Sequence, residues 1–334
     1  MLRYSFPGVV MSEGNPMTEH NTMRTVRYYD YGEPADVLRL ETAPVPEPQA
    51  GRVRIAVHAC GLAPADWAHC RGLSAGLLPR GIGLEASGTV EAIGEGVTDV
   101  ALGDRVFGMV DWAEHTSAGA ADYAIMENWF AVPDGLDLTQ AASLTMAFSA
   151  AHWFLMPLDV SPGRTILVNG AGTTTGYAAV QIALLRGARV IATAGTTYAR
   201  QLQALGAVVT RYGDGLVDRV SALAEGPVDG VFDTAPDSSV LPHLVQIAGG
   251  DAKRVITASN FAEGAKLGLA SVLDHLPPPE KRYAAVPECA RLAAEGRFTV
   301  PIAATFPLED WRTALDLSLS GHAHGKPLLL PADG

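Results

Sequence analysis

Cysteine, charge and long apolar runs are all scarce in this chain of 334 residues. Its three cysteines, Cys60, Cys70 and Cys289, are too few and too scattered for a disulfide framework, which favours the reducing cytoplasm. Only 18% of the residues are charged, and the formal net charge of −12 argues against nucleic acid or an anionic membrane as a partner. No apolar run approaches the roughly 18 residues of a membrane-spanning helix, so we expect none.

The first 22 residues lack the pattern of a folded domain. Residues 1–22 contain three methionines among glycine, asparagine and proline residues, with one short apolar run, Phe6–Val10. That run is too short for a signal peptide and has no cleavage-site pattern after it. We therefore expect a disordered extension or an upstream start, with the first domain beginning near Met23. The length of the remaining chain makes two domains the natural expectation.

The most informative segment is Thr165–Thr193, which contains two apolar runs on either side of a Gly/Thr-rich turn. The run Thr165–Val168 predicts a strand, Tyr177–Arg186 a helix, and Val190-Ile191 a second strand. Together they form one βαβ unit of about 30 residues. The N-terminus of its helix offers unpaired N–H groups and the positive end of the helix dipole, which favour a bound pyrophosphate.

The turn in this unit is a weak match to the dinucleotide fingerprint G-x-G-x-x-G. The three fingerprint positions read Ala171, Thr173 and Gly176, with Gly170 and Gly172 beside them. Only the third glycine is in place, so the order of strand, turn, helix and strand supports the prediction more strongly than the glycines do. The residues that we expect around the pyrophosphate are Ala171, Gly172, Thr173, Thr174, Thr175 and Gly176.

Short strands with glycine turns precede this unit, and strands alternate with helices after it. Arg24–Tyr29 and Val37–Glu41 indicate a hairpin and Val53–Ala59 alternates as a strand, which predicts a small barrel-like β domain. After a helix over Leu138–Leu155, the alternation predicts one parallel sheet with helices on both faces. The later predicted elements are strand Ala207–Thr210, helix Leu216–Glu225, strands Val228–Asp233 and Arg254–Ala258, helix Ala284–Glu295, strand Val300–Ala303, helix Leu308–Ser318 and strand Pro327–Leu330.

Many short motifs occur along the chain, namely Gly61–Asp66, Arg71-Gly72, Gly83–Gly88, Gly94–Val97, Gly103–Val106, Ala121–Ala124, Val168–Gln181, Gly296–Pro301 and Gly321–Lys326. Their order resembles the medium-chain dehydrogenase/reductase superfamily, and within it the zinc-free quinone oxidoreductase branch, from about Thr25 to Leu330. The resemblance implies an α/β fold with two domains. A doubly wound parallel-sheet (Rossmann) nucleotide domain, residues 147–282, is inserted into a GroES-like β-barrel catalytic domain, residues 23–146 and 283–334.

Zinc ligands are missing from the positions where related enzymes carry them. Zinc-dependent relatives place a cysteine three residues before the Asp of the early turn, a histidine in Gly-His-Glu, and a later cysteine. Ala63 and Leu84 occupy the first two of these positions in this chain. The short segment between Gly108 and Gly119 has no cysteine for a structural site. Four possible ligands lie close together in the sequence, namely His58, Cys60, His69 and Cys70. Their spacing does not match the signature of a tetrahedral zinc site, so we expect no metal.

The residues after the glycine turn favour NADP(H) over NAD(H). An NAD site usually places an acidic residue about 20 residues after the turn, where it binds the ribose hydroxyls, but residues 177–212 contain none. Hydroxyl and guanidinium groups bind a 2′-phosphate, which a carboxylate would repel. The resemblance implies that Thr196, Arg200 and Tyr212 bind the 2′-phosphate. The alternative is that Arg200 is a solvent-exposed helix residue without a ligand. The resemblance also assigns two more residues to the cofactor site, Ser259 and Lys326.

The sequence is least informative about general acid and base residues. Hydride transfer needs a well-positioned acceptor, and a quinone can take its proton from water, so no catalytic side chain is obligatory. Asp66 lies in the active-site turn of the family and is the candidate proton donor, with helix capping as its alternative role. Trp67 and Tyr123 are candidates for the acceptor pocket, or for the core.

These observations predict a zinc-independent, NADPH-dependent oxidoreductase that reduces a quinone or an activated alkene or carbonyl. The nearest alternative is an enoyl-thioester reductase, although Leu73–Arg80 lacks the tyrosine that such relatives usually place there as proton donor. A non-catalytic NADP(H)-binding, redox-sensing protein is the alternative from another class. The resemblance also implies a cytoplasmic homodimer that pairs through Arg254–Ser259 and Phe261–Leu273. We expect a small-molecule acceptor and neither nucleic acid nor a membrane as a partner.

Overall fold

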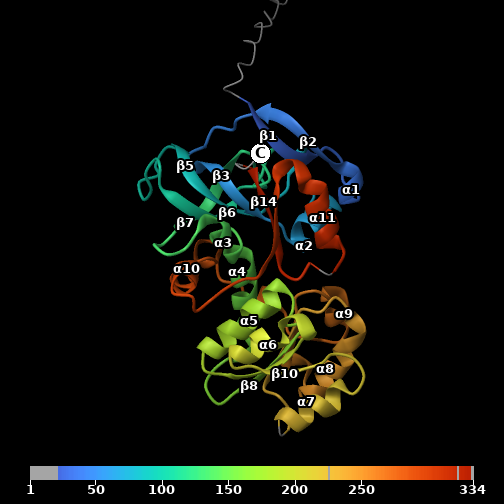
Figure 1. Cartoon of the computed structure of the whole chain (residues 1–334). Helices are drawn as coiled ribbons and strands as arrows, with labels where there is room; N and C mark the ends of the chain where they lie inside the picture. Colours follow the sequence, from blue (N-terminus) through green and yellow to red (C-terminus); the bar gives the residue numbers. More distant parts are fainter. Residues whose placement is uncertain (1–21, 225, 322, 332–334) are drawn as a thin grey trace, which may run out of the picture.

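The computed structural model describes residues 22–224, 226–321 and 323–331, which form two parts (Figure 1). One part is rich in β-strands and contains both the first and the last strand of the described chain. The other part contains a parallel sheet between helices. The extension expected over residues 1–22 lies outside the described residues, apart from Thr22 at the start of β1.

Apolar, β-branched runs form the parallel sheet, as the sequence predicts. The strand order is β10-β9-β8-β11-β12, and every adjacent pair is parallel. The chain leaves β8 toward one edge of the sheet and returns to its other side at β11, which places a crevice at the carboxyl ends of β8 and β11. The elements are β8 (Thr165–Asn169), α5 (Thr174–Leu185), β9 (Arg189–Thr193), α6 (Thr196–Ala204), β10 (Val208–Thr210), α7 (Leu216–Ala224), β11 (Gly230–Asp233), α8 (Leu241–Ile247), β12 (Val255–Thr257) and α9 (Phe261–Lys266).

Alternate side chains of the parallel strands pack on opposite faces of the sheet. On one face, buried residues such as Val168 and Phe232 pack in the same core cluster as side chains of α5 and α6. On the other face, Leu167 and Val231 pack in a cluster with side chains of α7 and α8. This period of two is the geometry of a strand that is covered on both sides. The expectation of a parallel sheet with helices on both faces is therefore confirmed.

The β-rich part contains two sheets. A three-stranded sheet has the order β2-β1-β4, and a six-stranded sheet has the order β13-β14-β3-β5-β6-β7. Strand β3 also pairs with β7, so β3, β5, β6 and β7 form a closed ring of pairings. The elements are β1 (Thr22–Tyr28), α1 (Pro34–Val37), β2 (Leu38–Pro44), β3 (Val53–Gly61), α2 (Pro64–Cys70), β4 (Arg80–Gly81), β5 (Glu85–Ile93), β6 (Arg105–Val110), β7 (Tyr123–Ala131), α10 (Val286–Ala294), β13 (Ile302–Pro307), α11 (Trp311–Leu319) and β14 (Lys326–Leu330).

Both ends of the described chain contribute to this β-rich part, as the sequence predicts. Strand β14 pairs with β3, where Leu328 lies opposite Gly61, and the red β14 runs beside the blue β3 in Figure 1. A single complete barrel is not confirmed, because the strands divide between two sheets. The expected domain boundaries near residues 146/147 and 282/283 stay predictions.

The helix expected over Leu138–Leu155 is broken near its start. It consists of α3 (Leu138–Ala141) and α4 (Leu144–Leu155). The Ser143 hydroxyl donates a hydrogen bond to the carbonyl oxygen of Gln140 at 2.7 Å, and such a local bond competes with helical pairing. Residues Leu138–Leu158 are long and apolar enough to span a membrane by length and composition, but 67% of the qualifying window is buried inside the structure.

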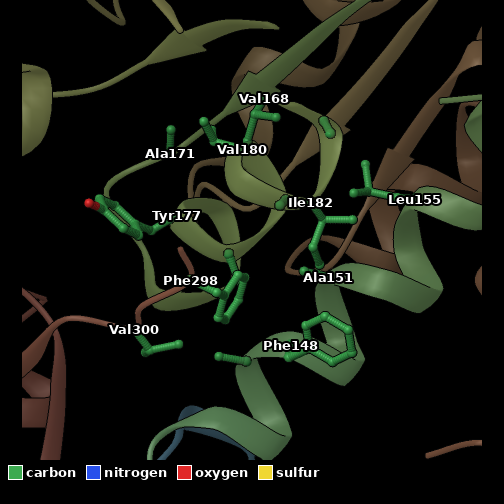
Figure 2. Packing of buried hydrophobic residues seen from close by; sticks show 14 of the residues in the cluster. Phe148, Ala151, Leu155, Val168, Ala171, Tyr177, Val180, Ile182, Phe298 and Val300 are labelled. Atoms are coloured by element: carbon green, nitrogen blue, oxygen red, sulfur yellow. The ribbon is translucent and has the colours of Figure 1, made fainter. Parts of the chain in front are cut away.

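Buried side chains of α4 pack at the junction of the two parts. Phe148 packs edge-on against Phe298 with ring centroids 5.6 Å apart, in the same buried cluster as Ile182 of α5 (Figure 2). Burying each such aromatic side chain contributes roughly 1.5–3 kcal/mol. This shared cluster joins α4, α5 and the chain that returns to the β-rich part.

Candidate cofactor-binding site

A cavity of about 740 Å³ opens at the carboxyl ends of the parallel strands. This volume is within the usual range for sites that bind small molecules, and its place is the crevice at which parallel α/β sheets bind their ligands. Residues at or after the ends of β8, β9, β10 and β11 line it, together with Gly321 from the turn between α11 and β14. Those from the parallel-sheet part are Asn169, Gly170, Gly172, Thr173, Thr193, Ala194, Gly195, Tyr212, Gly213, Asp214, Gly215, Leu216, Val217, Ala235, Pro236, Asp237, Ser239, Val240 and His243.

The turn after β8 and the first three residues of α5, together residues 170–176, are called the phosphate loop below. Gly170 has a φ of +78°, and an added Cβ there would lie 2.8 Å from the backbone nitrogen of Ala235. An added Cβ on Gly176 would lie 2.5 Å from the carbonyl oxygen of Gly170. A Cβ on Gly172 would meet only the Tyr198 ring, at an ordinary 3.6 Å. The loop therefore needs glycine at its first and last residues, but not at 172.

Thr173 has a different role from the one that the fingerprint suggests. Its backbone is extended, with φ −76° and ψ 158°, and its hydroxyl oxygen accepts a hydrogen bond from the N–H of Gly176 at 3.0 Å. Thr173 is therefore the N-cap of α5. The same hydroxyl lies 2.9 Å from that of Thr234. The loop is not simply a fingerprint with its glycines lost, because the threonine at 173 satisfies a backbone donor that glycine would leave open.

The phosphate loop fits a pyrophosphate because two of its backbone N–H groups are available as hydrogen-bond donors. The backbone N–H groups of Thr174 and Thr175, the first two residues of α5, have no acceptor within the described part of the chain. They lie at the positive end of the helix dipole, beside Gly172 and Thr173 of the cavity wall. Ala171 is buried, and its N–H donates to the carbonyl oxygen of Thr193, so it supports the loop from behind.

Of the three residues expected around a 2′-phosphate, Tyr212 lines the cavity, whereas Thr196 and Arg200 lie on α6 outside its lining. Thr196 and Arg200 are both exposed and lie one turn apart on α6, which begins directly after Gly195 of the cavity wall. Tyr212 is 68% exposed and lines the cavity, and an added Cβ on Gly195 would lie 4.0 Å from its ring. Arg200 forms no ion pair with any residue that the structure describes, so its charge is free for a ligand.

Two carboxylates line the cavity although residues 177–212, where an acidic residue is expected in an NAD site, contain none. Asp214 lies next to Gly213 and Gly215, and Asp237 follows β11. Asp237 accepts a hydrogen bond from the N–H of Ser239 at 2.9 Å, and the side chain of Ser239, followed by this N–H, lowers the pKa of the Asp237 carboxyl group. The expected spacing of about 20 residues after the glycine turn does not predict them. They lie further along the chain, and only the fold brings them to the cavity.

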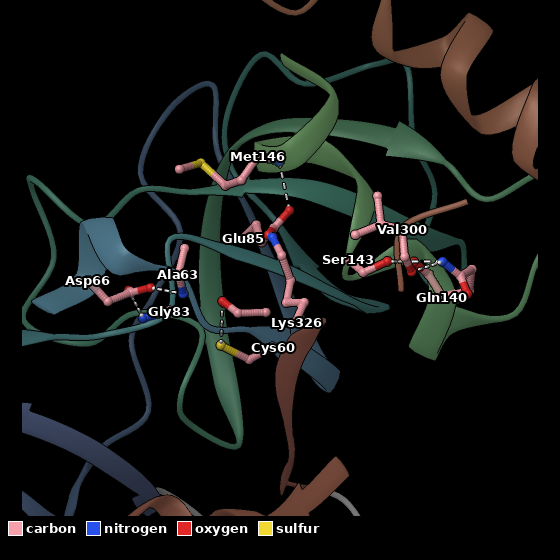
Figure 3. Close-up of polar contacts among 11 residues, drawn as sticks. Cys60, Ala63, Asp66, Gly83, Glu85, Gln140, Ser143, Met146, Val300 and Lys326 are labelled. Atoms are coloured by element: carbon pink, nitrogen blue, oxygen red, sulfur yellow. Dashed lines mark hydrogen bonds and ion pairs between the residues drawn. The ribbon is translucent and has the colours of Figure 1, made fainter. Parts of the chain in front are cut away.

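The structure places Ser259 and Lys326 apart from each other. Ser259 is exposed just after β12, and its N–H donates to the hydroxyl of Thr257 at 3.2 Å. Lys326 is buried at the start of β14, where its ammonium forms an ion pair with Glu85 (Figure 3). Neither residue lines the cavity, and the ammonium of Lys326 is directed to a carboxylate of its own chain.

Asp66 lies at the start of α2 with both carboxylate oxygens engaged. One accepts the N–H of Ala63 at 2.8 Å and the other the N–H of Gly83 at 2.6 Å (Figure 3). Burial raises the pKa of Asp66 to about 6, against these two hydrogen bonds, which lower it. This is the geometry of a helix-capping carboxylate. A role for Asp66 in proton transfer stays a prediction.

Asp66 also brings together the two positions where zinc-dependent relatives carry ligands. It binds the backbone of Ala63 and of Gly83, the neighbour of Leu84, and the side chains at 63 and 84 have no metal-binding atom. Among the described residues there is no group of three or more His, Cys, Asp or Glu side chains arranged to hold a metal ion. In the cluster singled out from the sequence, His58 contacts Thr139 and His69 stacks on Trp112.

A buried polar network behind the phosphate loop is not visible in the sequence. Asp233 is fully buried and accepts hydrogen bonds from the Asn169 amide and the Thr257 hydroxyl, each at 2.8 Å. Asn169 in turn accepts from Thr193 at 2.7 Å, and the Thr193 hydroxyl accepts from the N–H of Gly170 at 2.9 Å. These side chains join the carboxyl ends of four parallel strands and hold the first residue of the loop. To predict these contacts from the sequence, one would have to know the order of the strands in the sheet and which strand ends lie side by side.

Comparisons with known protein families match most of the chain in two segments. The family described as alcohol dehydrogenase GroES-like domain matches residues 49–152. The family described as zinc-binding dehydrogenase matches residues 205–329. The phosphate loop lies between the two matched segments.

Individual relatives agree with these families. A quinone oxidoreductase of Sus scrofa is 36% identical over 185 residues, which are 54% of this chain and 55% of that protein. The chain thus spans about half the length of the quinone oxidoreductases that it matches. An alcohol dehydrogenase superfamily protein from Novosphingobium aromaticivorans has the same fold, with a TM-score of 0.80, 24% identity, and coverage of 92% of this chain and 99% of that one. The CurK enoyl reductase also has this fold, with a TM-score of 0.77, 21% identity, and coverage of 92% and 99%.

Proposed function

Since the chain belongs to the medium-chain dehydrogenase/reductase superfamily, we propose that it is a zinc-independent, NADPH-dependent oxidoreductase that reduces a quinone or an activated alkene or carbonyl. One observation carries the proposal. A 740 Å³ cavity at the carboxyl ends of the parallel strands meets a helix N-terminus whose first two N–H groups are free. A bound nicotinamide cofactor would supply the hydride, and the protein would supply the binding site and the orientation.

The choice of NADPH rests on the residues that follow β9 and β10. Arg200 carries an unpaired charge one turn along α6 from Thr196, and Tyr212 lines the cavity nearby. A guanidinium and a hydroxyl favour a 2′-phosphate. Asp214, on the same cavity wall, acts in the opposite direction because its carboxylate repels a phosphate. Neither Arg200 nor Asp214 forms an ion pair within the described part of the chain, so removing Arg200 tests which of the two charges sets the choice.

Zinc independence rests on the side chains around Asp66. Alanine and leucine occupy the two positions that the capping carboxylate brings together, so a Lewis-acid site has no ligands there. We expect no stoichiometric zinc in the purified protein and full activity in a strong chelator. One zinc ion per chain by elemental analysis would refute this part of the proposal.

The proposed assembly is a cytoplasmic homodimer that acts on a small molecule, without nucleic acid or a membrane. Strand β12 is the edge strand of the parallel sheet, and two large apolar side chains that follow it, Phe261 and Leu273, are 60% and 74% exposed. The outer edge of β12 receives one backbone hydrogen bond, from the N–H of Ala270 to the carbonyl oxygen of Val255 at 2.9 Å. Such an edge beside exposed apolar groups is suited to pairing with a second copy. Light scattering tests this, and a monomer mass at every concentration would contradict it.

The second candidate is an enoyl-thioester reductase, and the observation in its favour is the fold shared with the CurK enoyl reductase. The segment Leu73–Arg80 has no tyrosine that could donate a proton. Oxidation of NADPH followed against a panel of quinones, enones and 2-enoyl thioesters separates the two. Turnover of thioesters in preference to quinones would favour the second candidate.

A further inference from the structure

We propose that Thr234 is a positioning residue for the cofactor, because its hydroxyl holds the phosphate loop in shape through Thr173. This inference rests on the proposed function. Thr234 is the first residue after β11 and lies 61 positions from Thr173. Its hydroxyl lies 2.9 Å from that of Thr173, 2.8 Å from the carbonyl oxygen of Gly170 and 3.0 Å from that of Asn169.

The hydrogen-bond directions follow from the number of protons. The Thr173 hydroxyl oxygen already accepts the N–H of Gly176, so its own proton is free for the Thr234 oxygen. The Thr234 proton then goes to a carbonyl oxygen, of Gly170 or of Asn169, since a carbonyl can only accept. The result is a chain of bonds from the first turn of α5 to the end of β8.

The Thr234 hydroxyl also fills the space between the two essential glycines of the loop. An added Cβ on Gly170 or on Gly176 would lie 2.8 Å from the Thr234 oxygen in each case. The oxygen is therefore in the centre of the turn, where it contacts both ends of the loop and excludes any side chain from them. Thr234 itself is only 5% exposed.

Thr234 is well anchored, so that it can hold its neighbours. Its backbone N–H donates to the carbonyl oxygen of Asn169 at 2.9 Å. The preceding residue, Asp233, accepts hydrogen bonds from Asn169 and Thr257 at 2.8 Å each. The loop is thus braced against two strands, β11 and β8, while the free N–H groups of Thr174 and Thr175 are left to a pyrophosphate.

Removing the hydroxyl should affect the pyrophosphate more than the rest of the cofactor. Without the Thr234 hydroxyl, the Thr173 hydroxyl loses its acceptor, and the carbonyl of Gly170 or of Asn169 loses its side-chain donor. The first turn of α5 then becomes less ordered, and its N–H groups are less well aligned on a phosphate. Thr196 and Arg200 lie on α6 and form no hydrogen bond with Thr234, so contacts with a 2′-phosphate should be unchanged.

The test compares Thr234→Ala, Thr234→Val and Thr234→Ser by titration calorimetry with two ligands. NADPH contains the pyrophosphate, whereas adenosine 2′-phosphate has the same adenosine and 2′-phosphate with no phosphate on its 5′ carbon. Thr234→Ala and Thr234→Val should weaken NADPH roughly tenfold, the range for a lost buried hydrogen bond, and leave adenosine 2′-phosphate within about twofold. Thr234→Ser keeps the hydroxyl and should restore NADPH binding. A folded Thr234→Ala that binds NADPH as tightly as the wild type, or that loses both ligands equally, would overturn the inference.

A second readout separates this inference from the proposed function. If the wild type binds neither NADPH nor NADH, the proposed function fails, and hydrogen exchange of the unliganded protein then tests the loop alone. Thr234→Ala should speed exchange at the N–H of Gly176, which is bound to the Thr173 side chain. The N–H of Tyr177 is bound to the Thr173 backbone at 2.8 Å and serves as the control. Equal protection of Gly176 in variant and wild type would show that Thr234 does not hold the loop.

Discussion

The carboxylate of Glu85 and the ammonium of Lys326 form a buried ion pair across 241 positions of the chain. Their side chains are 1% and 2% exposed, and the second oxygen of Glu85 accepts the N–H of Met146 at 2.8 Å. One carboxylate thereby joins β5, β14 and the start of α4 (Figure 3). The pair connects the last described strand to the middle of the β-rich part, close to where α4 leaves for the parallel sheet.

Breaking this pair on one side should destabilise the protein strongly. Lys326→Met leaves the Glu85 carboxylate buried without a counter-ion, which costs about 3–5 kcal/mol in comparable sites. Glu85→Gln should cost a similar amount by isolating the ammonium. The double variant should lose less than the sum of the two, because neither charge remains. Free energies of unfolding from urea titrations measure all three, and strict additivity would show that the two groups do not interact.

A side chain at Gly176 should prevent cofactor binding. A Cβ there would lie 2.5 Å from the carbonyl oxygen of Gly170, so Gly176→Val must move α5 away from β8. We expect loss of measurable NADPH binding and a destabilisation of roughly 1–3 kcal/mol from overpacking. Gly172→Ala is the matched control for stability, because its Cβ meets only the Tyr198 ring at 3.6 Å. Calorimetry measures the binding and thermal unfolding the stability, and equal destabilisation by the two substitutions would contradict the loop geometry.

The charge of Arg200 should select the phosphorylated cofactor. Arg200→Ala should weaken NADPH by on the order of 1–3 kcal/mol and leave NADH nearly unchanged, the range for a charge-assisted hydrogen bond. Arg164→Ala is a suitable control, since Arg164 is an exposed arginine of the same part that pairs with Asp159 and Asp229 before the amino end of β8. Dissociation constants for both cofactors are the measurement. Equal losses with NADPH and NADH would show that Arg200 does not contact the 2′-phosphate.

The burial of Asp66 should make stability depend on pH. Its pKa in the folded protein is about 6, above the ordinary value of 3.8, because burial disfavours the charged form. The group therefore adds stability below about pH 4, and this contribution is lost as pH rises through 6. Relative to Asp66→Asn, the wild type should lose roughly 2–3 kcal/mol between pH 4 and 7, from the size of this shift. Urea unfolding at several pH values tests this, and a constant difference between the two proteins would contradict it.

Local pattern predicts the parallel sheet well, because each strand is an apolar run between turn residues. The same reasoning misses contacts made only when strand ends meet, such as Asp233 with Asn169 and Thr257. It also interprets Thr173 as a lost glycine, since spacing does not show that its hydroxyl caps α5. The carboxylate of Asp214 lies just beyond the window in which an acidic residue is expected, and only the fold places it on the cavity wall.

The β-rich part is less predictable from the sequence for a related reason. Alternation identifies strands such as β3, but not which strands pair, and β3 pairs with β5, β7 and β14. Lys326 illustrates the consequence for the site. The resemblance places it at the cofactor, whereas its nearest charged partner is Glu85, which no local pattern associates with it.

The most direct test of the account is the initial rate of NADPH oxidation with a quinone acceptor in the presence of a strong chelator, compared with the rate for NADH. We predict acceptor-dependent oxidation that is faster with NADPH than with NADH at equal concentration and unaffected by the chelator. The absence of acceptor-dependent oxidation with both cofactors, or activity that the chelator abolishes and zinc restores, would contradict it.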